Sequence, residues 1–83
     1  MTSVADVKAA LELACEHMRD SYRSVREAQQ ALDEAVEILG EAGSNHHESL
    51  LPPEFTRAGE RFGELLELMV RSLEAAQRLS GEL

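Results

Sequence analysis

The sequence predicts an all-α protein, an antiparallel two-helix hairpin that dimerises into a four-helix bundle. Apolar residues recur at alternating spacings of three and four over two long segments, a pattern typical of amphipathic helices that pack together. A short polar segment without periodicity separates them. The apolar stripe of the first segment is wider than a single helix–helix contact requires, which favours a bundle. We expect one domain spanning residues 1–83.

The first helix is expected over residues 3–42. Ser3 can cap it, and Asp6 three residues later resembles a capping box. Cys15, Tyr22 and Val36 widen the apolar stripe on one flank, and Ala10, Ala31 and Ile38 widen it on the other. The predicted seam, which has a single polar member, consists of Val4, Val7, Leu11, Ala14, Met18, Ser21, Val25, Ala28, Leu32, Ala35 and Leu39.

A loop is expected over residues 43–52 and a second helix over residues 53–80. Pro53 and Glu54 suit the first turn of a helix, and Gly81 is the expected stop. Gly59 and Gly63 each cost ~1 kcal/mol relative to Ala inside a helix, so a close helix approach over them and a relaxed exposed position are both open. The second predicted seam consists of Phe55, Ala58, Phe62, Leu65, Met69, Ser72, Ala76 and Leu79.

The wide stripe and the unequal helix lengths predict that the hairpin binds a partner. Folding the chain about residues 47–48 places Val25 near Met69 or Val70 and Met18 near Ala76, and it leaves little or nothing opposite Val4 and Val7. We expect a homodimer, with another helical protein as the alternative partner and a monomeric hairpin as the competing possibility. The expected contact residues are Val4, Val7, Leu11, Met18, Val25, Leu32, Phe62, Leu66, Met69 and Leu73.

The sequence contains no evident catalytic machinery, so we expect no enzyme and no cofactor. His46, His47 and Glu48 are the best metal candidates, but adjacent loop residues project in different directions, and a soluble loop is the preferred interpretation. A small metal-binding bundle that combines two such loops is the alternative. Ser21 and Ser72 come close in the expected register and are interpreted as a polar layer that fixes it.

Charge and composition exclude several other functions. The formal net charge is −8, with 16 acidic and 8 basic side chains, which argues against binding to nucleic acids and anionic membranes. No apolar run approaches the ~20 residues of a membrane-spanning helix, and no conventional signal peptide opens the chain. The single cysteine, Cys15, is expected to be a buried, inert thiol and fits a reducing compartment. We expect a cytoplasmic protein, with export independent of a signal peptide as the alternative.

A hairpin of this length, acidic balance and alanine-rich seam resembles the WXG100 (ESAT-6-like) helical-hairpin proteins. The resemblance covers nearly the whole chain. It implies dimers or four-helix bundles, and type VII export or association with toxins. The family's turn carries a Trp-x-Gly motif, whereas this chain has Gly43-Ser44-Asn45-His46-His47. The family's export signal, Tyr-x-x-x-Asp/Glu near the C-terminus, has no counterpart here, since the only tyrosine is Tyr22. Many small actinobacterial proteins share the same architecture.

Overall fold

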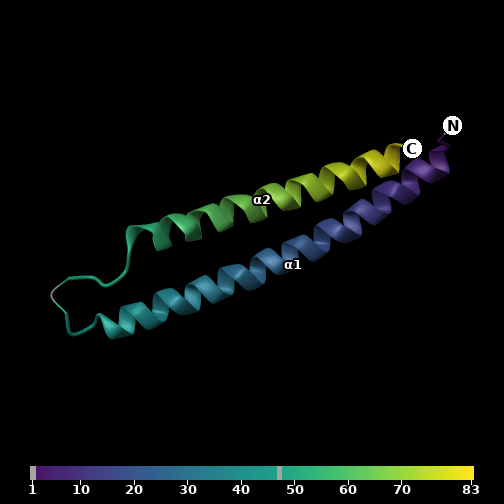
Figure 1. Cartoon of the computed structure of the whole chain (residues 1–83). Coiled ribbons are helices and arrows are strands. Elements are labelled where there is room, and N and C mark those ends of the chain that lie inside the picture. Colours follow the sequence, from purple (N-terminus) through teal and green to yellow (C-terminus); the bar gives the residue numbers. More distant parts are fainter. Residues whose placement is uncertain (1, 47) are drawn as a thin grey trace.

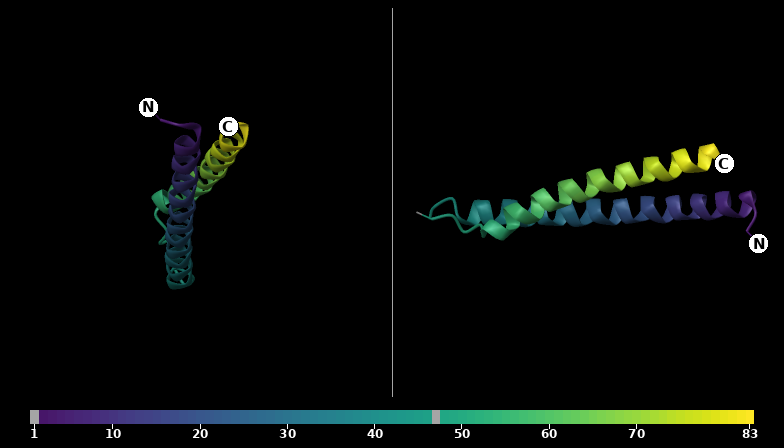
Figure 2. Two further views of the ribbon diagram at one scale, coloured as in Figure 1. Left: turned by 90° about the vertical axis from the view of Figure 1, so that its right-hand side faces the viewer. Right: turned by 90° about the horizontal axis from the view of Figure 1, so that it is seen from above.

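The computed structural model describes residues 2–46 and 48–83 and confirms the all-α hairpin. Helix α1 runs over Val4–Ala42 and helix α2 over Pro53–Glu82. The two helices lie side by side and antiparallel, with the loop at one end and both chain termini at the other (Figure 1). They cross at an angle when the hairpin is viewed along and across its length (Figure 2).

The helix ends follow local capping chemistry. At the start of α1 the Asp6 backbone N–H donates to Ser3 Oγ at 3.1 Å, and the Ser3 backbone N–H donates to Asp6 Oδ2 at 3.3 Å, a complete capping box. Pro53 opens α2 after the extended residue Pro52. The expected stop at Gly81 is wrong, because α2 continues through this glycine to Glu82. A glycine in the final turn costs too little to end a helix by itself.

Only part of each predicted seam faces the other helix. Half-buried or buried residues of α1 repeat every seven residues in two series, one from Leu11 to Leu39 and one that includes Cys15, Tyr22 and Val36. The predicted members Ala14, Ser21 and Ala28 are exposed instead. Larger side chains bury more apolar surface, so the flank that carries them turns toward α2.

The second helix shows the same rotation. Leu66 and Leu73 pack toward α1 together with Phe62 and Met69, whereas the predicted seam residues Leu65 and Leu79 are exposed. Each helix therefore carries one apolar flank that the hairpin uses and a second that it leaves open.

The register also differs from the expectation. Met18 lines one hollow with Met69 and Leu73 and another with Leu65 and Met69, rather than lying near Ala76. Helix α2 is thus displaced toward the start of α1, and the two helices end near each other (Figures 1 and 2). The expected overhang of α1 is correspondingly shorter.

The hairpin is a thin rod with almost no core. It measures 66 × 17 × 15 Å, and its radius of gyration is 19.2 Å, whereas a compact chain of this length has about 12 Å. Among the described residues only Cys15 and Leu66 are buried, at 5% and 7% exposure. A two-layer structure this narrow buries one side of each helix at most, which leaves a large share of its apolar surface in water.

Candidate interaction surface

The unused flanks of the two helices lie on the same side of the hairpin. Residues spaced seven apart on α1, such as Ser21 and Ala28, project to one side of the contact with α2, and Leu65 and Ser72 project to that same side from α2. We call this side the open face. It comprises Val7, Ala10, Ala14, His17, Ser21, Ser24, Ala28, Ala31, Ala35 and Ile38 of α1 and Ala58, Leu65, Leu68, Ser72, Ala75 and Leu79 of α2.

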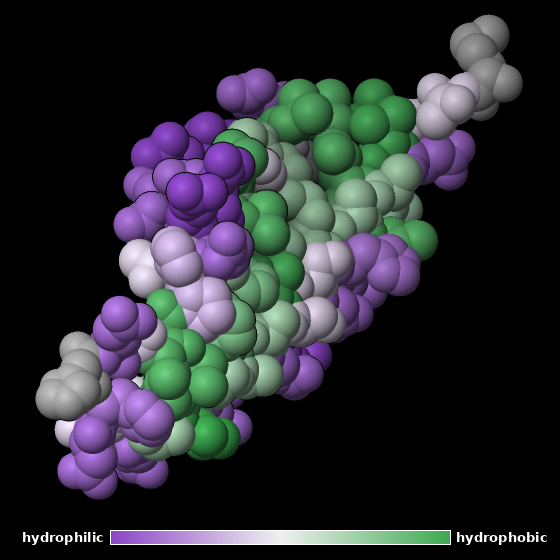
Figure 3. Space-filling model, turned by 60° about the vertical axis from the view of Figure 1, so that its left-hand side comes forward, coloured by the Kyte–Doolittle hydropathy of each residue, from purple (hydrophilic) through white to green (hydrophobic). Residues whose placement is uncertain are grey.

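The open face is apolar and exposed over most of its length. Its largest side chains, Ile38, Leu68, Leu79 and Leu65, are 65%, 59%, 49% and 43% exposed. None of the α1 members is Asp, Glu, Lys or Arg, although α1 as a whole is rich in Asp, Glu and Arg. Seen from this side, a continuous apolar band runs along the hairpin between hydrophilic margins (Figure 3). Such a band is more extensive than the scattered apolar residues of an ordinary protein surface.

A shallow hollow marks the centre of the open face. Met18 and Met69 form its floor between the helices, and the other lining side chains belong to the open face itself. These are His17, Ser21, Leu65, Leu68 and Ser72. A second, smaller hollow lies further along α2 and is lined by Ala58, Arg61, Phe62 and Leu65. The surface is therefore grooved between its two helices, a shape into which the ridge of another helix packs.

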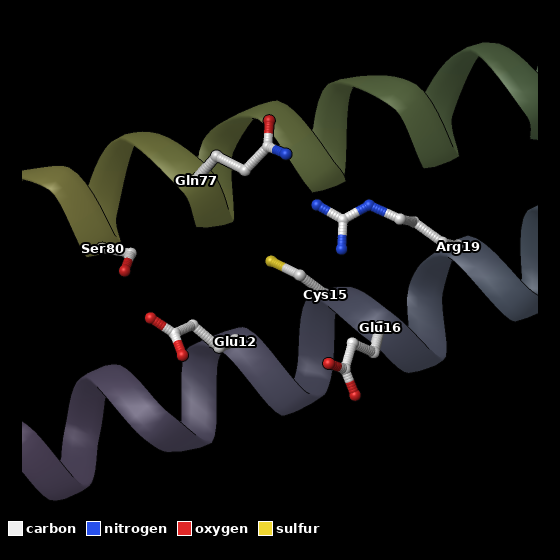
Figure 4. A pocket seen from close by; sticks show the side chains of 6 residues that line it. All are labelled: Glu12, Cys15, Glu16, Arg19, Gln77 and Ser80. Carbon is white, nitrogen blue, oxygen red and sulfur yellow. The ribbon is translucent and has the colours of Figure 1, made fainter.

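The opposite face of the hairpin is more polar than the open face, although Tyr22, Val70 and Leu73 line an apolar hollow on it. One hollow there is lined from α1 by Glu12, Cys15, Glu16 and Arg19 and from α2 by Gln77 and Ser80 (Figure 4). The Cys15 thiol points between the helices at the base of this hollow (Figure 4). Its low exposure confirms that the cysteine is buried. Val70, at 41% exposure, is the principal apolar side chain open to water on this side.

Most of the predicted contact residues are used within the hairpin. Leu66 is buried against α1, and seven others, from Leu11 to Leu73, are half-buried between the helices. Only Val4 and Val7 are exposed. Sequence reasoning did not select Leu65, Leu68, Leu79 and Ile38 as contact residues, although the first and third belong to the predicted seam. The signal in the sequence that indicates them is the width of the apolar stripe. The stripe is wide enough for two helix contacts, one with the other helix of the hairpin and one on the open face, and the two contacts share a central row of residues.

The two serines at the centre do not bond to each other. Ser21 and Ser72 line the same hollow, as the expected register implied. The Ser72 hydroxyl, however, donates to the Leu68 carbonyl oxygen of its own helix at 2.8 Å. A polar layer that fixes the register through a bond between these two hydroxyls is therefore not formed in the hairpin.

The two helix-interior glycines are not sites of close helix approach. A Cβ atom added to Gly59 or Gly63 would meet nothing within 4 Å beyond the local helix backbone. Within the hairpin, therefore, neither glycine marks a close helix approach, and the interpretation as relaxed positions is the correct one. Gly43 differs, because a Cβ there would lie 3.2 Å from the Leu39 carbonyl oxygen and 3.4 Å from Leu50.

The loop candidates for a metal site are only partly described. His46 and Glu48 are exposed and line a hollow with Gly43 and Leu50. His47 lies outside the described residues. Within residues 2–46 and 48–83, no group of three or more potential ligands gathers.

Comparison with known proteins adds no assignment to this surface. No protein-family model matches the chain, and no significant match was found among the curated proteins or the solved structures. In the described part of the chain, neither helix combines the length and apolar character of a membrane-crossing segment.

Proposed function

We propose that this protein is a non-enzymatic interaction and oligomerisation module that acts through the open face. The observation that supports the proposal is the exposure of Leu65, Leu68 and Leu79 beside an uncharged strip of α1. Removing one such side chain from water contributes ~1.5–3 kcal/mol. Several of them on one face supply a driving force for helix packing that the hairpin itself does not use.

The total surface area supports the same conclusion. The chain exposes 6477 Å², whereas a compact monomer of its mass exposes roughly 4,900 Å². The excess of roughly 1,500 Å² per chain is nearly twice the ~800 Å² that each partner contributes to a standard protein–protein interface. An interface of that size would give the protein the core that the isolated rod lacks.

Sedimentation equilibrium with a pair of matched variants tests the proposal. Leu65 and Val70 have nearly equal exposures, 43% and 41%, but Leu65 belongs to the open face and Val70 to the opposite face. We expect the wild-type chain to exceed its monomer mass at tens of micromolar. Leu65→Asp should shift it toward monomer by at least roughly tenfold in dissociation constant, and Val70→Asp should have little effect. A strictly monomeric wild type, or equal effects of both changes, contradicts the proposal.

A WXG100-like hairpin that pairs with a different hairpin is the second candidate. The grooved open face and the rod shape would serve such a partner equally well. The genes beside the coding sequence distinguish the candidates, because a dedicated partner hairpin or a type VII secretion system encoded there would favour this second function.

A further inference from the structure

We propose that the open face binds a second copy of the chain in one defined orientation. In this dimer each α1 packs against the α2 of the partner, and both loops lie at the same end of a four-helix bundle. The inference rests on the proposed function and adds to it the identity and the direction of the partner. The charges that border the open face carry the argument.

The α1 border of the open face is acidic. Asp20, Glu27, Glu34 and Glu41 repeat every seven residues immediately beyond the uncharged strip, and all four are exposed. We call them the acidic edge. Successive members of such a series lie along one line of a helix that packs with heptad spacing. The acidic edge therefore runs parallel to the open face for much of its length.

The α2 border is basic. Arg57, Arg71 and Arg78 occupy the corresponding line of α2, Arg61 lies beside them, and Glu64 is the one acidic member. All are exposed. We call the four arginines the basic edge. The chain as a whole is strongly acidic, with a net charge of −8, yet half of its basic residues border this side of α2.

Two symmetric arrangements can cover the open face of each copy with that of the other. If the two-fold axis runs parallel to the helices, the acidic edge of each copy meets the basic edge of its partner, at both sides of the bundle. If the axis runs across the helices, α1 meets α1 and α2 meets α2, so acid faces acid and Arg faces Arg. Charge complementarity selects the first arrangement, since like charges across an interface oppose association.

The positions along the rod agree with this choice. A two-fold axis parallel to the helices keeps every residue of the partner at its original height. Because Met18 lies beside Met69 and Leu73, Asp20 is about level with Arg71. Shifting by one heptad along each helix places Glu27 about level with Arg61 and Glu64, and a further heptad places Glu34 about level with Arg57. Asp20 and Glu34 thus lie about level with Arg71 and Arg57 of the partner, twice in the dimer, whereas Glu27 lies level with Glu64 and has Arg61 about one helical turn away.

The bonds that these edges make within the hairpin do not prevent the new contacts. Arg71 Nη2 pairs with Glu67 at 2.7 Å, and Asp20 pairs with Arg23 Nη1 at 3.3 Å. Both pairs lie within one helix, and all four side chains are largely exposed. Exposed pairs of this kind hold their partners weakly, so Asp20 and Arg71 remain available to a neighbouring chain.

Size and shape also fit a second copy. Two chains that each cover the excess surface would bury about 3,000 Å² in total, which lies in the range of obligate homodimers. The α1 strip consists mainly of alanine and serine, and small side chains let a helix approach closely. The larger Leu65, Leu68 and Leu79 of the partner's α2 would fill the space above this strip, so that small residues face large ones.

Distance measurement between spin labels in the loop tests the orientation. The label is attached at Asn45→Cys in a Cys15→Ala background, at an exposed position of the loop. Neighbouring helices in a bundle lie ~10 Å apart, so loops at the same end should give a label separation below about 35 Å. Antiparallel copies would place the labels at opposite ends of a rod 66 Å long and would give a separation close to that length.

The outcomes separate the orientation from the function. A short separation together with a dimer mass confirms the proposal. A separation near the rod length in a dimer overturns the orientation and leaves the proposed function standing, whereas a monomer mass with no dipolar coupling overturns both. If Cys15→Ala unfolds the chain, the same label can be placed in the wild-type background, because the buried Cys15 should resist labelling.

Discussion

Leu65 and Leu66 are neighbours in α2 that lie in opposite environments. Leu66 is 7% exposed and packs against α1, whereas Leu65 is 43% exposed on the open face. Two leucines in succession cannot both face the same partner in a helix, since successive residues are rotated by about 100°. This pair therefore separates the contact that makes the hairpin from the contact that the hairpin offers to another chain.

Shortening each of these leucines should affect different equilibria. We expect Leu66→Ala to lower the free energy of unfolding by ~2–5 kcal/mol, because it removes a buried side chain from a very small core. Leu65→Ala should cost under ~1 kcal/mol in dilute solution and should mainly weaken association. Urea unfolding followed by circular dichroism at several protein concentrations distinguishes the two. Equal losses at low concentration would contradict this assignment of faces.

Reversing the acidic edge should weaken the dimer. Asp20→Arg with Glu34→Arg would place arginines level with Arg71 and Arg57 of the partner on both sides of the bundle, and we expect the dissociation constant to rise at least roughly tenfold at low salt. Added salt should reduce the difference between variant and wild type, since exposed charges are screened. Sedimentation at two ionic strengths measures both effects.

The control for that experiment makes the same charge change away from the open face. Glu16→Arg with Glu37→Arg alters two exposed residues that lie on the far side of α1. It should leave the dimer unchanged or slightly tighter, because it lowers the net negative charge of both copies. Equal weakening by the two double variants would show that the position of the charges is unimportant.

Replacing Gly63 should stabilise the protein. A Cβ at this position meets nothing within 4 Å, and alanine is better than glycine in a helix interior, so Gly63→Ala should raise the free energy of unfolding by ~0.5–1 kcal/mol. Gly43→Ala is the comparison, since its Cβ would lie 3.2 Å from the Leu39 carbonyl oxygen and should bring no such gain. Thermal unfolding of both variants is sufficient. A loss of stability in Gly63→Ala would reveal a close approach at that position.

The thiol of Cys15 should react slowly in the folded protein. Its side chain is 5% exposed between the helices, so a thiol reagent reaches it only when the hairpin opens. We expect the labelling rate to rise steeply in urea and to fall at higher protein concentration. Asn45→Cys in a Cys15→Ala background should react quickly under all these conditions. Fast labelling of native Cys15 would mean that the helices separate readily.

The sequence was sufficient for the architecture because its signals are local. The capping box at Ser3, the proline at Pro53 and the long alternation of apolar residues predict two helices and a turn without reference to any other chain. The predicted C-terminal end of α2 was wrong at Gly81, because the cost of one glycine in the last turn is too small to end the helix.

The choice of face could not be made from spacing alone. Ala14 and Cys15 both satisfy the heptad pattern, and only the greater size of the flank containing Cys15, Tyr22 and Val36 decides which side turns toward α2. The size of the side chains also decides the register of the two helices. Met18 packs beside Met69, where large side chains interlock, although the spacing of apolar residues is equally compatible with a shifted pairing. The open face and its charged edges become visible only once that rotation is known.

The near absence of buried side chains has a consequence for the life of the protein in the cell. With Cys15 and Leu66 as its only buried residues among those described, a single hairpin is held folded weakly, so association should add to its free energy of unfolding as the protein concentration rises. Newly made chains at low abundance would then be open to proteases, and chains that find a partner would be protected. The amount of intact protein would rise more steeply than its rate of synthesis, which makes its level a threshold response.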